Sequence, residues 1–150
     1  MTPAKKISLN DPAPNFTLKD EKGNLISLSD FLNKKKIILF FYQGDMTPAC
    51  TMQLCAVRDD WNKFINADTT VLAINQGNAE SHKKFKAQYN FPFPLLVDPD
   101  LKTGESYNAL AEHNGVKFLK RLVVAIDKTG KIKYLRHGMP ENNEILKSLK

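Results

Sequence analysis

The sequence predicts an α/β fold with a mixed central sheet, helices on both faces of that sheet and a β-hairpin at the N-terminus. Two apolar runs, KIILFFY at 36–42 and TVLAIN at 70–75, are typical of buried central strands because they are apolar on both faces. A helical segment joins them, so the two strands should pair in parallel. A third strand is expected at 121–127, and the turn after it leads into the alternating segment KIKYLR, an outer antiparallel strand.

The N-terminal part of the chain carries a hairpin pattern. Residues 15–28 alternate apolar and polar side chains on both sides of Lys22-Gly23-Asn24. Ser29 and Asp30 follow, and we expect them to cap a short turn of helix.

Two helices are expected on either side of the second strand. The first covers 50–66, because its apolar residues recur at three- and four-residue steps. Its apolar stripe comprises Leu54, Val57, Trp61, Phe64 and Ile65. The second covers 79–90 and is polar, with Phe85 and Tyr89 on one face.

The remaining elements are shorter. A strand bounded by prolines is expected within 91–100, followed by a weak helix and a loop at 101–115. The tail from Pro140 is a final helix whose inward side chains are Ile145, Leu146 and Leu149. This order of strands and helices is that of the thioredoxin-like fold.

Length and composition indicate one domain over residues 1–150. The hydrophobic fraction is 42% and the charged fraction 25%, as in ordinary globular domains. No apolar run approaches the roughly 18 residues of a membrane span, and the first ten residues lack the apolar stretch of a signal peptide. We therefore expect a cytoplasmic protein that does not enter a membrane.

The net charge of +6 lies partly in two lysine runs, at 33–36 and 82–86. A basic balance can attract nucleic acid or an acidic protein. Neither run is interleaved with aromatic residues in a nucleic-acid-binding motif. We therefore expect a solvated basic surface and no nucleic-acid partner.

The chain has two cysteines, Cys50 and Cys55, too few for a disulfide scaffold. In a reducing compartment such a pair is typical of catalytic, redox-sensing or metal-binding sites. Two thiols do not complete a four-ligand zinc site, and His82, His113 and His137 show no ligand spacing, so no metal is expected. His82 and His137 are expected to be solvated polar residues.

Cys50 lies at the expected start of the helix 50–66, just after the strand 36–42. Unpartnered backbone N–H groups and the helix dipole favour an anion at that position. The thiolate of Cys50 should therefore be stabilised, and thiolate is the nucleophilic form of cysteine.

Cys55 lies deeper in the same helix. Five residues of helix give about 7.5 Å of rise, so the two Cα atoms should lie roughly 8 to 9 Å apart. A disulfide needs Cα atoms within about 7 Å. Either a Cys50–Cys55 bond never forms, or the first turns of the helix unwind when it does. Two structural cysteines that behave as small hydrophobic residues are a third reading.

The segment FFYQGDMTPACTMQLCAVRDDW resembles the active-site segment of peroxiredoxins, most closely that of the peroxiredoxin Q group, also called bacterioferritin comigratory protein. The typical pattern of the group is F-Y-P-x-D-x-T-P-x-C-T-x-E-x-C-x-x-R-D. The chain matches it at Phe41, Tyr42, Asp45, Thr47, Pro48, Cys50, Thr51, Cys55, Arg58 and Asp59. The opening hairpin, the segment from Ser81 to Asp100 and the strand RLVVAIDKTGKI are also similar to the family, so the resemblance covers essentially the whole chain.

This resemblance implies a thiol-dependent peroxidase for hydrogen peroxide and small organic hydroperoxides that uses no metal, haem, flavin or other cofactor. Cys50 matches the peroxidatic cysteine, which becomes a sulfenic acid, and Cys55 the resolving cysteine, which closes an intramolecular disulfide. Thr47 matches the residue whose hydroxyl binds thiolate and peroxide, and Arg121 matches the arginine that polarises the peroxide. Thioredoxin or a similar dithiol protein is the implied reductant, and the implied assembly is a monomer or weak homodimer.

The chain departs from the family pattern at three places. Gln43 replaces a proline that packs over the reactive sulfur, and Gln53 replaces a glutamate that helps to orient the arginine. Val123 and Val124 replace Thr-Phe after the arginine. We interpret these changes as variation within an active enzyme, with reduced rate or altered peroxide preference as the alternative.

Two other functional classes are open on the residues alone. A thiol–disulfide oxidoreductase of the same fold normally carries Cys-x-x-Cys, which keeps both sulfurs within bonding reach. A non-enzymatic binding or chaperone domain would carry incidental cysteines. Within the peroxidase reading, an enzyme in which Cys55 does not resolve would take its second thiol from another molecule.

Overall fold

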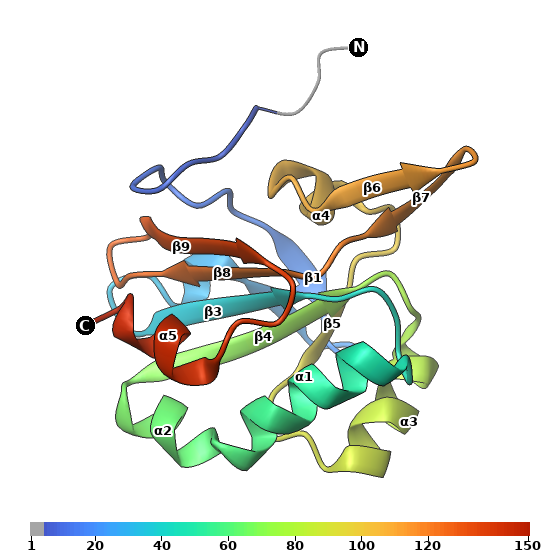
Figure 1. Cartoon of the computed structure of the whole chain (residues 1–150), viewed down its shortest axis with the longest axis horizontal. Coiled ribbons are helices and arrows are strands. Elements are labelled where there is room, and N and C mark those ends of the chain that lie inside the picture. Colours follow the sequence, from blue (N-terminus) through green and yellow to red (C-terminus); the bar gives the residue numbers. More distant parts are fainter. Residues whose placement is uncertain (1–4) are drawn as a thin grey trace.

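The computed structural model describes residues 5–150; residues 1–4, part of the segment in which no signal peptide is expected, lie outside this range. A seven-stranded sheet with strand order β2-β1-β5-β4-β3-β8-β9 forms the centre of the structure (Figure 1). Its strands are β1 (Thr17–Lys19), β2 (Leu25–Ser27), β3 (Lys36–Phe41), β4 (Thr69–Asn75), β5 (Leu95–Val97), β8 (Leu122–Ile126) and β9 (Ile132–His137). A separate two-stranded sheet contains β6 (Leu110–His113) and β7 (Val116–Leu119).

The helices lie on both faces of the sheet, but unevenly (Figure 1). One face is covered by α1 (Pro48–Asp59), α2 (Trp61–Asn66), α3 (Ala79–Tyr89) and α5 (Asn142–Lys147). The other face is covered by the 3-10 helix η1 (Leu28–Asp30), by the loop after α4 (Lys102–Ser106) and by β7. The predicted α/β, thioredoxin-like fold is confirmed.

Strand pairing follows the expected pattern. β3 and β4 are parallel, and β3 pairs with β8 in the antiparallel sense, with Phe41 opposite Leu122. β9 is the outer strand of the closing hairpin, and β1 and β2 form the predicted N-terminal hairpin. Because β3 runs toward the same sheet end at which β8 begins, Arg121 lies beside the end of β3.

Two buried clusters fill the space on the two faces of the sheet. β3 contributes alternately to both, because successive side chains of a strand point to opposite faces. Ile38, Phe40 and Tyr42 belong to the cluster beneath α1, which also contains Cys50. Ile37, Leu39 and Phe41 belong to the cluster on the other face. Both faces of β3 are therefore buried, as its apolar run predicts.

The prediction of one helix over 50–66 is wrong. Helix α1 begins at Pro48, ends at Asp59 and is followed by a second helix that starts at Trp61. Asp60 leaves the helical conformation at ψ 17°, and its carboxylate accepts a hydrogen bond from Asn142 of α5 at 3.0 Å. Because of this break, the apolar stripe does not continue along one face from α1 into α2. Ile65, which was expected to point inward, is 54% exposed.

The prediction for 101–115 is only half right. The short helix is present as α4, but the expected loop contains strand β6, which pairs with β7 around Asn114-Gly115. Both turn residues have positive φ, 50° and 78°, as a tight hairpin turn with an Asn-Gly pair requires. The second small sheet is therefore an element that the predicted order of strands lacks.

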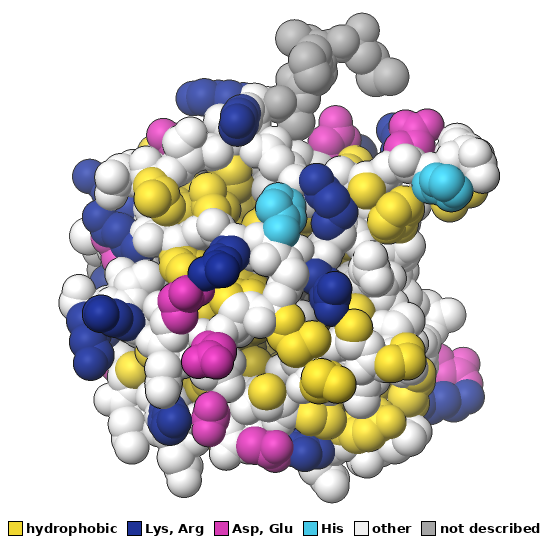
Figure 2. All heavy atoms as spheres, in the orientation of Figure 1, with side chains coloured by type: hydrophobic (Ala, Val, Ile, Leu, Met, Phe, Trp, Pro, Cys, Tyr) yellow, Lys and Arg dark blue, Asp and Glu magenta, His cyan; other side chains and the backbone are white. Residues whose placement is uncertain are grey.

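Three smaller points concern caps, charge and membrane segments. The short helix after the hairpin is η1, which contains both Ser29 and Asp30, so the predicted cap at Ser29 is wrong. Its N-cap residue is Ser27, whose N–H donates to the carboxylate of Asp30 at 2.9 Å. Basic and acidic side chains are interspersed on the face shown in Figure 2. Among residues 5–150, no helix has the length and hydrophobicity needed to cross a membrane.

Candidate active site

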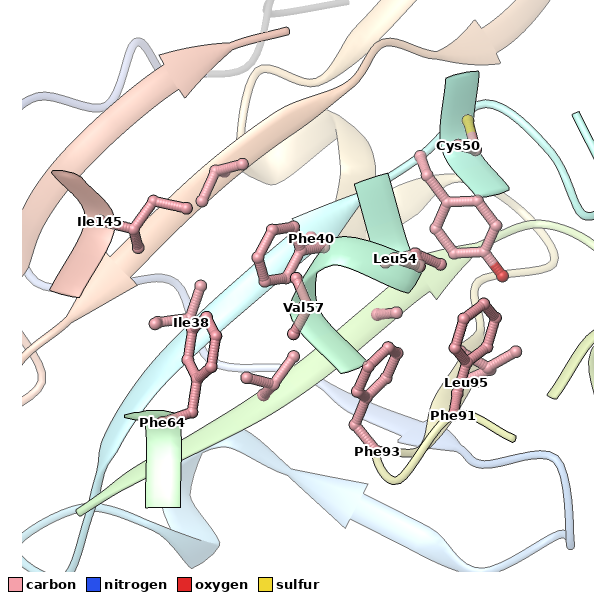
Figure 3. Packing of buried hydrophobic residues seen from close by; sticks show 14 of the residues in the cluster. Ile38, Phe40, Cys50, Leu54, Val57, Phe64, Phe91, Phe93, Leu95 and Ile145 are labelled. Carbon is pink, nitrogen blue, oxygen red and sulfur yellow. The ribbon is translucent and has the colours of Figure 1, made fainter. Parts of the chain in front are cut away.

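Cys50 is the third residue of α1, which follows β3 through the loop 43–47 (Figure 3). Thr47 is the N-cap residue and Pro48 is the first residue of the helix, where its missing N–H and fixed φ cost nothing. The first helical hydrogen bond runs from Thr51 N–H to Thr47 C=O at 2.9 Å. The N–H groups of Ala49 and Cys50 therefore have no partner within the helix. This end of α1 favours an anion, as the sequence predicts.

The Cys50 side chain has no exposed surface and packs in the cluster beneath α1. Gln43, which replaces the family proline, is exposed. The sulfur is nevertheless fully shielded by its other neighbours, so the substitution does not open the pocket.

Thr47 is half-buried, and its side chain does not cap the helix. Its hydroxyl instead donates to the carbonyl of Gly44 at 2.9 Å, within the same loop. The hydroxyl oxygen keeps its lone pairs for another donor. Thr47 is thus held by the loop that covers Cys50.

Arg121 directly precedes β8 and is half-buried. Its side chain belongs to the face of the sheet beneath α1, because Val123 and Ala125, two and four residues further on, lie in the cluster with Cys50. Its backbone carbonyl accepts the N–H of Gly138 at 3.0 Å. The guanidinium has no hydrogen-bond or ion-pair partner within residues 5–150.

Cys55 lies on the same uninterrupted helix as Cys50, and both are free thiols. Cys55 is partly buried against the same cluster. Because α1 is intact over both residues, a bond between the two sulfurs requires the helix to unwind. The structure shows the two thiols unbonded on an intact helix, which fits both alternatives that the sequence left open.

Gln53 lies between the two cysteines and is only 3% exposed. Its Nε2 donates to the carbonyl of Gly138 at 3.2 Å, while its Oε1 has no hydrogen-bond partner among the described residues 5–150. It lines a cavity of about 290 Å³ between α1 and the segment 139–143. Gln53 therefore ties α1 to the end of β9, and no hydrogen bond from it to an arginine is found within residues 5–150.

The prediction that His82 is solvated is wrong: its side chain has no exposed surface. Its Nδ1 lies 2.6 Å from a carboxylate oxygen of Asp45, in the loop before Cys50. The sequence contained a signal for Asp45, which matches the family pattern, but none for its partner on α3, 37 residues away. His137 is exposed, as expected.

The AhpC/TSA family matches residues 9–135 of the chain. The chain is 38% identical over 148 residues to the chloroplastic peroxiredoxin Q of Oryza sativa subsp. japonica, covering 96% of this chain and 67% of the relative. The chain belongs to the peroxiredoxin family. This peroxiredoxin is also 39% identical to a putative peroxiredoxin bcp of Coxiella burnetii, over 84% of this chain and 85% of the relative.

Solved structures agree with this peroxiredoxin over nearly its whole length. The crystal structure of peroxidoxin BcpB from Mycobacterium tuberculosis superposes with a TM-score of 0.86 at 25% identity, covering 93% of this chain and 94% of that one. The fold also matches a Xylella fastidiosa PrxQ mutant, with a TM-score of 0.87 at 24% identity and 96% coverage of both chains. The protein is thus a thiol peroxidase, an enzyme that reduces a peroxide with electrons from a thiol reductant.

Proposed function

We propose that Cys50 is the peroxidatic cysteine and that its thiolate attacks one oxygen of hydrogen peroxide or a small organic hydroperoxide. The observation that carries this proposal is the position of Cys50 on the first turn of α1, beside backbone N–H groups without helical partners. In the attack the sulfur–oxygen bond forms as the oxygen–oxygen bond breaks. Cys50 becomes a sulfenic acid, and hydroxide or alkoxide leaves and takes up a proton.

Arg121 and Thr47 are proposed to bind the peroxide. The guanidinium of Arg121 has no protein partner in residues 5–150, so its N–H groups are free to stabilise the negative charge that develops on the leaving oxygen. The hydroxyl of Thr47 can accept a hydrogen bond from the peroxide while it still donates one to the carbonyl of Gly44. Thr47 directly precedes α1, and Arg121 directly precedes Leu122, which pairs with Phe41 at the end of β3.

Cys55 is proposed as the resolving cysteine. Its thiol attacks the sulfur of the Cys50 sulfenic acid, water leaves and an intramolecular disulfide forms. The first turns of α1 must unwind for this step, because an intact helix keeps the two residues apart. An external dithiol protein, thioredoxin or a similar partner, then reduces the disulfide through a mixed disulfide.

The remaining proposals concern the cellular setting. We place the enzyme in a reducing compartment, the cytoplasm, because its cycle needs a dithiol donor; several plant relatives are named as chloroplastic. We propose that residues 1–150 act as one domain, as a monomer or weak homodimer, without nucleic-acid or membrane partners. The interspersed charges in Figure 2 support the last point.

Single-turnover assays with hydrogen peroxide test the assignment. Cys50→Ser should abolish peroxide consumption, whereas Cys55→Ser should keep the first oxidation and lose the disulfide. Non-reducing mass spectrometry after one equivalent of peroxide should show a Cys50–Cys55 bond in the wild type. Peroxide consumption by Cys50→Ser at the wild-type rate would show that the cysteine is assigned wrongly, and a bond between two chains would show that Cys55 does not resolve within its own chain.

A further inference from the structure

The Asp45 carboxylate, in the loop before Cys50, is buried and fully provided with donors. Its Oδ1 accepts the hydroxyl of Tyr42 at 2.6 Å. Its Oδ2 accepts the hydroxyl of Ser81 at 2.7 Å and lies 2.6 Å from Nδ1 of His82. Burial raises the pKa of Asp45, but the hydrogen bonds from His82, Tyr42 and Ser81 together lower it below the usual value, so the group is ionised.

His82 faces acceptors with both ring nitrogens. Nδ1 meets the ionised carboxylate, and Nε2 lies 3.1 Å from the carbonyl oxygen of Leu96 on β5. A carboxylate and a carbonyl oxygen can only accept hydrogen bonds, so the two contacts fit a ring that donates from both nitrogens. This geometry is that of a buried ion pair between imidazolium and carboxylate.

This ion pair holds the loop that shapes the site. Met46, next to Asp45, has φ 64°, a left-handed conformation that is strained for a non-glycine residue. Ser81 and His82 of α3 both contact the Asp45 carboxylate, so α3 holds this strained loop through Asp45. The loop leads directly to Thr47, the N-cap residue of α1.

Tyr42 connects the ion pair to the reactive sulfur. The pKa of its hydroxyl is raised well above the usual value by burial first, then by the charge of Asp45 and their hydrogen bond, and also by the charge of Cys50. Asp45 and Cys50 thus act electrostatically on the same hydroxyl. A negative charge on Asp45 that nothing balances would also disfavour the thiolate of Cys50.

We infer that the Asp45–His82 ion pair positions the Thr47–Cys50 turn and, through the positive charge of His82, cancels the carboxylate charge that would otherwise oppose the Cys50 thiolate. The inference rests on the proposed role of Cys50 in peroxide reduction. Neither partner touches the peroxide, so both are positioning residues. The pair makes the rate of the enzyme depend on a histidine on another helix.

The surroundings of His82 add no further charge to this argument. Among residues 5–150, the titratable groups that contact its ring are Asp45, from the loop, and Tyr42, directly after β3, whose ring centroid lies 6.3 Å from that of His82. β5 contributes a carbonyl and Ser81 of α3 a hydroxyl. Gly77 lies so close that a Cβ there would be 3.1 Å from both Asp45 and His82.

The test compares two variants that disturb the same pair but leave opposite charges. His82→Asn keeps an N–H near the position of Nδ1 and removes the positive charge. Asp45→Asn removes the negative charge. Ser81→Ala is the matched control, because it removes an uncharged donor from the same carboxylate. For the alkylation measurement each is made in a Cys55→Ser background, so that iodoacetamide reports on Cys50 alone, whereas peroxide reduction is measured with Cys55 present.

His82→Asn should move the pH midpoint of Cys50 alkylation upward by about one unit. Its peroxide reduction near neutral pH should fall about tenfold and recover as the pH is raised. Asp45→Asn should leave the alkylation midpoint unchanged or lower it, while its peroxide reduction falls at every pH because the loop is no longer held. Ser81→Ala should keep the wild-type midpoint.

If the pH midpoint of Cys50 alkylation were the same in His82→Asn, Asp45→Asn and wild type, the inferred cancellation of charge would be wrong. If both variants reduced peroxide at the wild-type rate, the inferred positioning role would be wrong. If His82→Asn does not fold, as judged by circular dichroism, Asp45→Asn decides: an upward midpoint or a wild-type rate contradicts the inference. Alkylation needs no peroxide. Failure of the proposed role of Cys50 would therefore appear separately, as peroxide reduction that survives Cys50→Ser.

Discussion

Each face of the central sheet buries one tyrosine, and the two tyrosines use their hydroxyl groups differently. Beneath α1, Tyr42 donates to the Asp45 carboxylate at 2.6 Å. On the other face, Tyr107 donates to the backbone carbonyl of Pro14 at the same distance. Burial is the first cause of a raised pKa for both hydroxyls, so both remain donors. One hydroxyl is part of a buried charged network, and the other ties down the N-terminal segment.

The two hydroxyl groups are equally buried, yet one belongs to a charged network and the other anchors a backbone segment. The face with η1, α4 and β7 has an apolar core whose polar contacts anchor the chain. The face with α1 has a core of similar size that also contains Cys50 and lies against the Asp45–His82 pair. Changes on the first face should alter stability alone, whereas matched changes on the second should alter both stability and peroxide reduction.

The largest expected effect is at Arg121. Arg121→Met should lower kcat/KM for hydrogen peroxide about 10²–10³-fold, because it removes the donors proposed to stabilise the leaving oxygen. Arg136→Met is the control, since Arg136 lies on the neighbouring strand and is already paired with Glu144 at 2.6 Å. Steady-state kinetics decide the question. If kcat/KM fell by a similar factor in both variants, Arg121 would act only through the positive charge or the stability of this edge of the sheet.

The two tyrosines give the next test. Tyr42→Phe removes a donor from a buried carboxylate and should lower the free energy of unfolding by about 2 kcal/mol, and peroxide reduction several-fold. Tyr107→Phe removes a bond to a neutral carbonyl and should cost about 1 kcal/mol, with peroxide reduction unchanged. Urea unfolding and single-turnover assays measure both quantities. The contrast between the faces fails if Tyr107→Phe slows the enzyme as much as Tyr42→Phe does.

A smaller effect is expected where α5 holds the end of α1. Asn142 donates to the carbonyl of Ala56 and to the carboxylate of Asp60, both at 3.0 Å. Asn142→Ala should loosen α1 by about 1 kcal/mol and speed disulfide formation a few-fold, because unwinding then costs less. Asn143→Ala is the control, since the Asn143 side chain accepts a hydrogen bond from the exposed Lys63 at 3.3 Å and makes no such bond to α1 within residues 5–150. Quenched-flow alkylation after a peroxide pulse follows the reaction, and a rate unchanged by Asn142→Ala would count against this contact as a brake.

The smallest effect is a pH dependence of opposite sign at two buried aspartates. The pKa of Asp45 is lowered, so its contribution to stability is present above its unfolded pKa and is lost as the pH falls through the lower folded value. Burial raises the pKa of Asp98, so its contribution is largest below its unfolded pKa and is lost as the pH rises through the higher folded value.

Urea unfolding at a series of pH values near 4 measures both contributions. The stability difference between wild type and Asp45→Asn should shrink as the solution becomes more acidic. The difference between wild type and Asp98→Asn should grow over the same range. Parallel pH profiles for the two variants would refute the assigned environments.

Much of the fold follows from apolar patterning, and the errors have local causes. The buried strands were predictable because their apolar runs are continuous. The hairpin β6–β7 was missed although Asn114-Gly115 is a strong turn signal, because Leu119 is the one fully buried residue of its two strands and the segment carries no continuous apolar run. The break at Asp60 was missed because the apolar spacing continues across it.

The site was predictable where it depends on sequence neighbours. The helix start at Cys50 follows from Thr47-Pro48, and the family pattern singles out Cys55 and Arg121, whose roles stay predictions. The burial of His82 could not be predicted, because a histidine on a polar helix gives no sign of a carboxylate that approaches from a distant loop. Long-range pairing of two polar residues leaves no periodic trace in a single sequence.

The uninterrupted helix over both sulfurs has a further consequence for the proposed cycle. Before the disulfide closes, oxidised Cys50 must wait for two turns of helix to melt, and during that wait a second peroxide can carry it to a sulfinic acid. Osmolytes that favour compact states should lengthen the wait. Under heavy oxidant load, the rigidity of this helix would then determine how many catalytic cycles each molecule survives.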